Sequence, residues 1–186
     1  ISSILIAEEY ARKSMTEPYG LENAPLVTSL SGMREKPAKT DTQKSAVFLT
    51  GLSYESHPVI LEEVMQAALT YQKQPNMQAY VFTGNLKVAQ NGMEALYRES
   101  RKKGVVFVKC KDALPVIQQE KNGAVSIEFL DEITCEKFSL SPDMVIVDET
   151  IIPDESLAHL SAVFGLDRDE YGFLQTENVH RTPLFT

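Results

Sequence analysis

Six residues that suit nucleotide binding follow two apolar segments of the sequence. Residues 46–51 and 79–84 are continuous apolar runs ending in glycine, which is typical of a strand buried on both faces that hands over to a loop. In an open parallel sheet, ligands bind where the carboxyl ends of the strands meet the amino ends of the helices. The candidate cofactor-binding residues at this edge are Gly51, Ser53, Ser56, Gly84, Asn85 and Lys87.

These six residues have two interpretations. In a nucleotide site, Asn85 is suited to hydrogen-bonding a ribose and Lys87 to pairing with a phosphate. The alternative is that the same polar side chains cap helices and hydrate loops. The turn Gly51-Leu52-Ser53-Tyr54-Glu55-Ser56 has one glycine, whereas a pyrophosphate-binding loop uses three, and Glu55 repels phosphate. The sequence therefore predicts a degenerate nucleotide site.

No catalytic or metal-binding residue is predicted. His57, His159 and His180 share no spacing with a carboxylate or thiol that would form a catalytic pair or a metal site. Cys110 and Cys135 stand 25 positions apart without a CxxC motif, so we expect buried, unreactive thiols. Four acidic groups lack the ligand periodicity of a calcium loop, and we expect them in solvated loops. They lie at residues 8–9, 131–132, 148–149 and 167–170.

The elements that would position these residues alternate between strand and helix. A helical pattern begins near Ser56 and ends before Pro75, and a second covers residues 88–103. Residues 105–108 form a third apolar segment. This alternation is typical of half a dinucleotide-binding fold, so residues 47–49, 81–82 and 105–108 are expected to be neighbouring parallel strands.

The pattern then becomes antiparallel. Three segments alternate with period two around the hairpin signal Asn122-Gly123, namely residues 115–119, 125–130 and 134–140. A buried strand at residues 144–147 and a helix at residues 155–164, ended by Gly165, complete the pattern. The predicted fold class is α/β: a Rossmann-like parallel sheet with helices on both faces plus a three-stranded antiparallel β-meander.

Composition divides the chain into three parts. Residues 1–44 are interpreted as a crossover strand at residues 4–7 and a surface linker at residues 16–43, with a half-buried patch at Leu26-Val27. Residues 45–150 form the Rossmann-like domain of pyridine-nucleotide type, with the meander. Residues 151–186 form a short helix and a C-terminal crossover segment. Because the chain opens on Ile1 and stops in a polar stretch, we expect it to be cut from a longer protein.

Charge and hydropathy exclude two classes of partner. The chain has 186 residues and a formal net charge of -8, which repels nucleic acid and anionic headgroups. The cluster Arg98, Arg101, Lys102 and Lys103 ends a helical pattern, where cations suit the helix dipole and a solvated face is expected. No apolar run reaches the roughly 20 residues of a membrane span, so we expect a cytoplasmic protein without membrane insertion. The possibility of a homo-oligomer is left open.

Three local motifs resemble the A-subunit family of heterodisulfide reductase flavoproteins, in the pyridine nucleotide-disulfide oxidoreductase superfamily. Tyr19-Gly20 followed by Pro25-Leu26-Val27-Thr28-Ser29-Leu30 is similar to the family's Tyr-Gly…Asn-Val-x-Thr-Ser-Leu stretch. Asn91-Gly92-Met93-Glu94-Ala95-Leu96-Tyr97 is similar to its Gly-x-x-Glu-x-Phe-Tyr helix. Gly165-Leu166-Asp167 and Asp169-Glu170-Tyr171-Gly172-Phe173 are similar to its Gly-Leu…Asp-Glu-x-Gly-Phe segment. The matches occur in the family's order along nearly the whole chain.

The resemblance implies a parent protein with electron-transfer chemistry. In that family an inserted domain of NAD(P)-binding type interrupts a FAD-binding domain, and iron–sulfur modules pass electrons between the flavin and partner subunits. The expected partners are therefore redox subunits or iron–sulfur proteins. Whether this chain itself takes part in a reaction is left open.

Two departures from the family remove the close backbone approach to a nucleotide. Where the family has Ala-Thr-Gly this chain has Ala7-Glu8-Glu9, and where it has a small residue and glycine this chain has Asp148-Glu149-Thr150. Both add negative charge where a phosphate or ribose would lie. We therefore expect no cofactor bound to the chain, FAD in the parent, and at most weak NAD(P)H binding. The alternatives are a cofactor-free docking domain for redox subunits, and a parent enzyme whose flavin sits wholly outside this chain.

Overall fold

A computed structural model describes residues 10–35, 44–88, 92–110, 114–121, 123–131 and 134–175. The chain divides into two compact units: Ser14–Thr150, and the paired segments Ile1–Lys13 and Ile151–Thr186. The strand expected at residues 4–7, the motif Ala7-Glu8-Glu9 and His180 lie outside the described residues.

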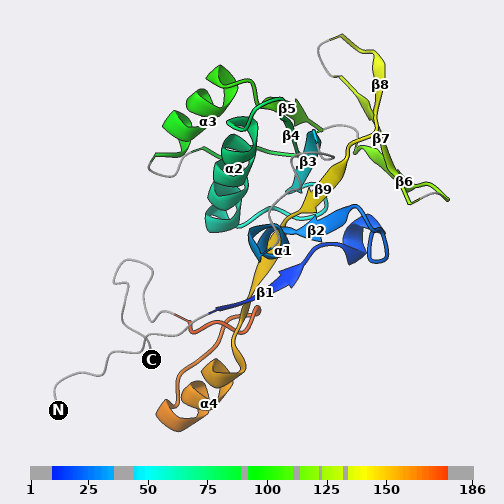
Figure 1. Cartoon of the computed structure of the whole chain (residues 1–186). Coiled ribbons are helices and arrows are strands. Elements are labelled where there is room, and N and C mark those ends of the chain that lie inside the picture. Colours follow the sequence, from blue (N-terminus) through cyan, green and yellow to red (C-terminus); the bar gives the residue numbers. More distant parts are fainter. Residues whose placement is uncertain are drawn as a thin grey trace. The chain divides into compact units, whose positions relative to one another are not determined.

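A parallel sheet of five strands forms the centre of the larger unit (Figure 1). Its order is β2-β9-β3-β4-β5, and all its neighbours pair in parallel. The strands are β2 (Val27–Ser29), β9 (Met144–Val147), β3 (Ser45–Thr50), β4 (Gln78–Thr83) and β5 (Val106–Lys109). The prediction of three neighbouring parallel strands is confirmed, with β5 starting one residue later than expected.

Two helices cover one face of this sheet. α2 (Pro58–Gln72) packs against β3 and β4, and α3 (Met93–Lys102) packs against α2. Leu61 and Met65 of α2 meet Met93 in a buried cluster that also contacts Phe107 of β5. α3 begins at Met93 rather than at Val88, because Gly92 at its N-cap has a φ of 86°, which is outside the helical region.

The opposite face is covered by the antiparallel meander. β6 (Val116–Gln119), β7 (Val125–Leu130) and β8 (Lys137–Leu140) form a separate three-stranded sheet, as predicted. Val125 and Ile127 of β7 pack with Val47 and Leu49 of β3 in one buried cluster. The predicted fold class is thus confirmed with one adjustment: in the described part of the chain, the meander takes the place of helices on this second face.

The segment interpreted as a surface linker is largely part of the core. The 3-10 helix η1 (Glu17–Tyr19), β2 and α1 (Leu30–Glu35) occupy it, and β2 pairs with β9. Leu21 and Leu30 are buried. The linker interpretation is therefore wrong for residues 16–35, and residues 36–43 lie outside the described part. Its many Pro and Gly residues shape turns that carry buried side chains between them.

Asp143 fixes the register at the start of β3. Its carboxylate accepts hydrogen bonds from the backbone N–H groups of Lys44 and Ser45, at 3.0 and 2.8 Å, and from the Ser45 hydroxyl at 2.7 Å. These bonds lower the pKa of Asp143, although burial opposes them. The β3–β9 pairing follows directly, from Ala46 opposite Met144 to Leu49 opposite Val147.

The smaller unit contains the end of the chain. β1 (Tyr10–Ser14) and β10 (Glu149–Pro153) form a two-stranded sheet, and α4 (Glu155–Phe164) follows β10. Asp154 caps α4 by accepting a hydrogen bond from Ser156 N–H at 2.9 Å, and Gly165 ends the helix with a φ of 63°. The helix therefore has the bounds expected from its sequence.

Candidate functional site

The two predicted nucleotide-binding turns meet at the carboxyl edge of the sheet. Gly51 follows β3 with a φ of 61°, and Gly84 follows β4, the strand paired with β3. A Cβ atom added to Gly84 would lie 2.8 Å from the carbonyl oxygen of Gly51. Gly84 therefore permits a close approach between the two turns that carry the predicted residues.

Lys87 is already engaged by the turn that it faces. Its ammonium forms an ion pair with the carboxylate of Glu55, and the two side chains are 55% and 65% exposed. This pair joins the turn after β4 to the turn after β3. The one cation predicted to meet a phosphate is thus paired with a carboxylate, and Asn85 is exposed.

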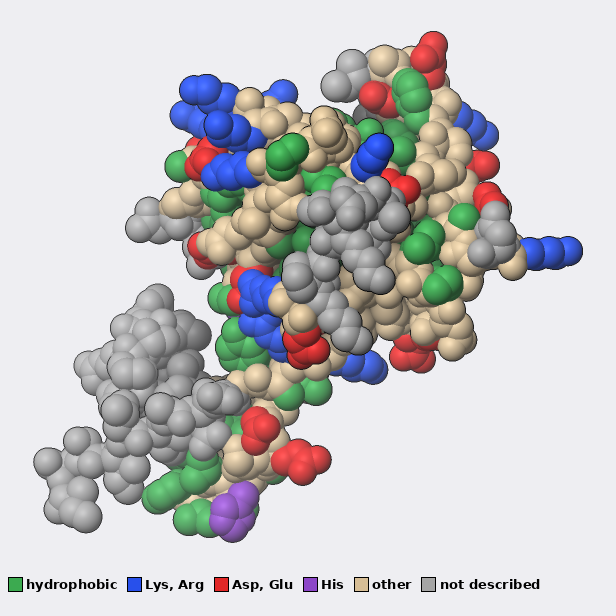
Figure 2. Space-filling model, in the orientation of Figure 1, with side chains coloured by type: hydrophobic (Ala, Val, Ile, Leu, Met, Phe, Trp, Pro, Cys, Tyr) green, Lys and Arg blue, Asp and Glu red, His purple; other side chains and the backbone are tan. Residues whose placement is uncertain are grey.

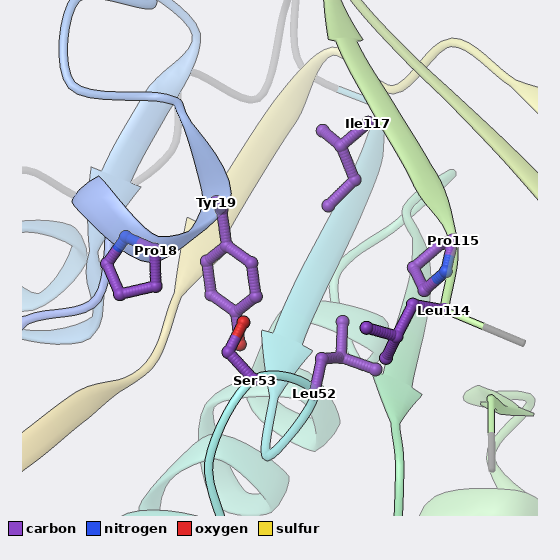
Figure 3. Close-up of a pocket in the computed structure, with 7 residues that line it drawn as sticks. All are labelled: Pro18, Tyr19, Leu52, Ser53, Leu114, Pro115 and Ile117. Carbon is purple, nitrogen blue, oxygen red and sulfur yellow. The ribbon is translucent and has the colours of Figure 1, made fainter.

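Ser53 and Ser56 occupy different surroundings. Ser53 is exposed and lines a pocket of about 230 Å³, in which the Tyr19 ring points toward Ser53 and Leu52 (Figure 3). Pro18, Leu114, Pro115 and Ile117 complete its mostly apolar wall. The Ser56 hydroxyl oxygen is buried without a hydrogen-bond partner in the described residues. Of the predicted residues, only Ser53 reaches this pocket.

Asp148 contacts the turn after β3 through its side chain. Its Oδ2 atom accepts a hydrogen bond from the backbone N–H of Gly51 at 2.9 Å, and the Tyr19 hydroxyl donates to its Oδ1 atom at 3.5 Å. The residue is 4% exposed. Burial raises the pKa of Asp148 to about 6, while the hydrogen bonds from Gly51 and Tyr19 act in the opposite direction. The carboxyl is therefore an anion held against the turn near neutral pH.

The Tyr19 ring lies beside the same turn, next to Leu52 and Ser53 (Figure 3). Burial, and next the charge of Asp148, raise the pKa of its phenol well above the usual range. The nearby backbone N–H groups of Leu52 and Ser53 act against that rise in pKa. Sequence reasoning quoted Tyr19 only as part of the family motif Tyr19-Gly20 and did not predict it as a site residue, because it lies in the segment interpreted as a linker.

Glu149 has a separate structural role. It is 4% exposed, and its carboxylate accepts hydrogen bonds from the backbone N–H and the hydroxyl of Ser31, at 2.9 and 2.8 Å. The expectation of a solvated acidic loop is therefore wrong for Asp148 and Glu149. Both carboxylates are buried because each satisfies backbone N–H groups that would otherwise lack partners.

The described residues include two of the three histidines and both cysteines. No group of three His, Cys, Asp or Glu side chains there is arranged to hold a metal ion. His57 caps α2, since its Nδ1 atom accepts a hydrogen bond from Val59 N–H at 3.3 Å, and His159 is exposed on α4. Cys110 is buried as expected, but Cys135 is exposed, which corrects its predicted burial.

The basic cluster lies on the surface of α3. Figure 2 shows Lys and Arg side chains gathering over this helix. Arg98 pairs with Glu94 at 2.9 Å, and Arg101 lies over the Tyr97 ring, 5.7 Å from its centroid. Both contacts are local to the helix, as expected for a solvated face. None of the described helices combines the length and hydropathy of a membrane span.

Comparison with known proteins gives one sequence relative and several shared folds. No family model matches the chain. It is 27% identical over 139 residues to the iron–sulfur A-subunit 1 of CoB–CoM heterodisulfide reductase from Methanopyrus kandleri, a match that covers 73% of this chain and 20% of that protein. The chain therefore spans about one fifth of this relative.

Two solved structures extend the comparison. Thioredoxin reductase of T. acidophilum superposes with a TM-score of 0.55 at 15% identity, over 92% of this chain and 51% of that one. FAD-bound DfoA, the cadaverine monooxygenase of Erwinia amylovora, gives a TM-score of 0.47 at 11% identity, over 92% and 49%. The inferred resemblance is thus confirmed: the chain is similar in sequence to part of a heterodisulfide reductase A-subunit and in fold to part of thioredoxin reductase.

Proposed function

We propose that this chain is the pyridine-nucleotide-type domain of a flavin-dependent electron-transfer oxidoreductase of heterodisulfide reductase type, with a degenerate nucleotide site. The observation that supports a degenerate nucleotide site is the hydrogen bond from Gly51 N–H to the Asp148 carboxylate. A backbone donor suited to a phosphate is satisfied by the chain's own carboxylate, which also repels a second anion. The engagement of Lys87 by Glu55 supports the same conclusion.

The proposal assigns a role to each part of the chain. Residues 45–150 are the inserted domain, and residues 1–44 and 151–186 connect it to a FAD-binding domain in the parent protein. FAD belongs to that parent, and redox subunits or iron–sulfur proteins are its partners. Coding sequence on both sides of this segment tests the parent's flavin domain. A Gly-x-Gly-x-x-Gly motif upstream supports it, and the absence of such a motif contradicts it.

Nucleotide titration tests the degenerate site. We expect calorimetry at pH 7.5 to show no saturable binding of NADH or NADPH up to millimolar concentration, and the purified chain to show no flavin absorbance. Glu55→Gln releases Lys87 but leaves Asp148 in place, so this variant should also fail to bind. One exposed ion pair contributes only about 0 to 1 kcal/mol, which is too little to restore a site.

A matched pair of lysines controls this experiment. Lys73 forms a comparable exposed ion pair with Glu99 at 2.9 Å, between α2 and the end of α3. Saturable micromolar binding that Lys87→Ala abolishes and Lys73→Ala preserves would restore a working nucleotide site. A flavin band that survives gel filtration would contradict the assignment of FAD to the parent alone.

A docking role is the second candidate, and the meander favours it. Phe138, a large apolar residue of β8, is 42% exposed. Phe138 stacks on Phe129 with ring centroids 5.8 Å apart, which holds the exposed ring in place. An iron–sulfur protein that co-purifies with the chain, but not with its Phe138→Ser variant, supports this role; retention by that variant contradicts it.

A further inference from the structure

Two side chains from elsewhere in this chain lie against the turn after β3. Gly51 N–H donates to the Asp148 carboxylate at 2.9 Å, and the Tyr19 ring lines a pocket together with Leu52 and Ser53. Successive backbone N–H groups of a turn at the end of a strand form a site that attracts an anion. The turn therefore has a phosphate-type donor at Gly51, and a carboxylate of this chain occupies it.

The backbone of Asp148 holds its carboxylate in this position. Its N–H donates to the carbonyl of Leu49 at 3.0 Å, and its carbonyl accepts from Met15 N–H at 3.1 Å. Asp148 thus follows β9 directly, beside the end of β3, with both of its backbone groups hydrogen-bonded. These bonds hold the backbone in place, so we expect a change at the turn to come from the side chain.

We propose that Asp148 is a built-in anion that closes the phosphate-binding turn of this domain while ionised, and that protonation of its carboxyl opens the turn to the pyrophosphate of a dinucleotide. The inference rests on the proposed function, since it names what controls the degenerate site. Two anions cannot share one set of buried donors, because the second charge meets both desolvation and repulsion. A neutral carboxyl removes the repulsion and weakens the hold on Gly51 N–H.

Among the titratable groups around the turn, Asp148 is the one whose ionisation changes the charge at the turn. Tyr19 stays protonated because its pKa is raised. Glu55 and Lys87 neutralise each other, and Glu149 faces Ser31. None of the ion pairs between described residues includes Asp148. The pKa of Asp148, raised to about 6 by burial, places the opening just below neutral pH.

Titration of the whole chain with NAD⁺ tests this inference, since the pyrophosphate diester of this probe keeps its charge between pH 5.5 and 7.5. If only the protonated form binds, a pKa of about 6 makes the apparent affinity roughly 25-fold weaker at pH 7.5 than at pH 5.5. Asp148→Ser removes the carboxylate and its volume, so this variant should bind with little dependence on pH. Asp143→Asn removes a carboxylate at the opposite end of β3 and should keep the wild-type dependence.

Each outcome separates the inference from the proposed function. Micromolar binding by the wild type at pH 7.5 contradicts the degenerate site itself. A wild type that is silent at both pH values, together with a folded Asp148→Ser variant that is also silent, overturns the built-in anion and leaves the degenerate site standing. The wild type also supplies a test without any variant: the Gly51 amide resonance should titrate with a midpoint near pH 6, and a pH-independent resonance overturns the proposal.

Discussion

The Oδ2 atom of Asp148 lies 2.9 Å from the backbone nitrogen of Gly51, across 97 positions of sequence. This bond joins the ends of β9 and β3 at the edge where open α/β sheets bind their ligands. A buried carboxylate is costly while it is ionised, and this one is retained in place of glycine or a small residue. Its effect on stability is therefore measurable separately from any ligand.

Asp148→Asn should stabilise the larger unit at pH 7.5. The folded-state pKa of Asp148 is raised from 3.8 to about 6, so its stabilising contribution is complete below pH 3.8 and is lost as pH rises through about 6. A rise of about two pKa units corresponds to up to about 3 kcal/mol at neutral pH. Urea unfolding of variant and wild type should diverge between pH 4 and 7. A constant difference across that range contradicts the raised pKa.

Tyr19→Phe should move the titration of Asp148 to higher pH. The hydroxyl hydrogen-bonds to the carboxylate and lowers its pKa, so removing the hydroxyl leaves the desolvation by burial less opposed. The midpoint of the Gly51 amide titration, followed by NMR, should rise above about 6. Tyr54→Phe provides the control, because Tyr54 is 68% exposed. A midpoint that falls in Tyr19→Phe shows that the phenol does not stabilise the anion.

Gly84→Ala should destabilise the chain through a clash rather than through backbone strain. Its Cβ atom would lie 2.8 Å from the Gly51 carbonyl oxygen, and such overpacking costs about 1 to 3 kcal/mol. Gly20→Ala is the comparison: Gly20 has a φ of 66° but open space around it, so about 1 kcal/mol is expected from conformation alone. Chemical denaturation ranks the two variants. If Gly84→Ala is as stable as the wild type, the turns after β3 and β4 move apart to admit the added Cβ atom, and the predicted clash is wrong.

Leu30→Ala should unfold the larger unit at markedly lower denaturant concentration. Leu30 is fully buried although it lies in a segment rich in turn residues, and such truncations cost about 2 to 5 kcal/mol. Leu114→Ala removes the same group from a 61% exposed side chain and should change stability by less than about 0.5 kcal/mol. If both variants unfold alike, residues 16–35 are not part of the core.

The sequence predicts those parts of the fold in which local pattern and burial agree. β3 and β4 are continuous apolar runs, and Asn122-Gly123 marks the hairpin, so these elements follow from periodicity and turn chemistry. β2 has three half-buried residues between a turn and α1, and its partner β9 lies more than a hundred positions away. No local signal distinguishes such a strand from a loop, because its stability comes from the sheet that it joins.

The sequence predicted which two turns meet, but not which distant side chains contact them. Strand ends brought Gly51 and Gly84 together as expected. The contact between Tyr19 and Asp148 spans 129 positions and depends on the path of η1, which the linker interpretation left without structure. A carboxylate after a buried strand indicated added charge, but not that this charge would be directed at the backbone of a turn in the same chain. A local sequence pattern cannot show which backbone N–H group a distant side chain will bind, because that depends on the fold of the whole chain.

Two carboxylates that flank β9 bind the backbone at opposite ends of β3. Asp143 binds the backbone at the first residue of β3, and Asp148 binds it just past the last. Replacing Asp148 removes the second attachment and leaves the first, together with the whole ladder from Ala46 to Leu49. The position that decides ligand access can therefore be varied without loosening the alignment of the strands. For protein engineering, a substitution at Asp148 is expected to free the Gly51 N–H for a ligand while the β3–β9 pairing is kept.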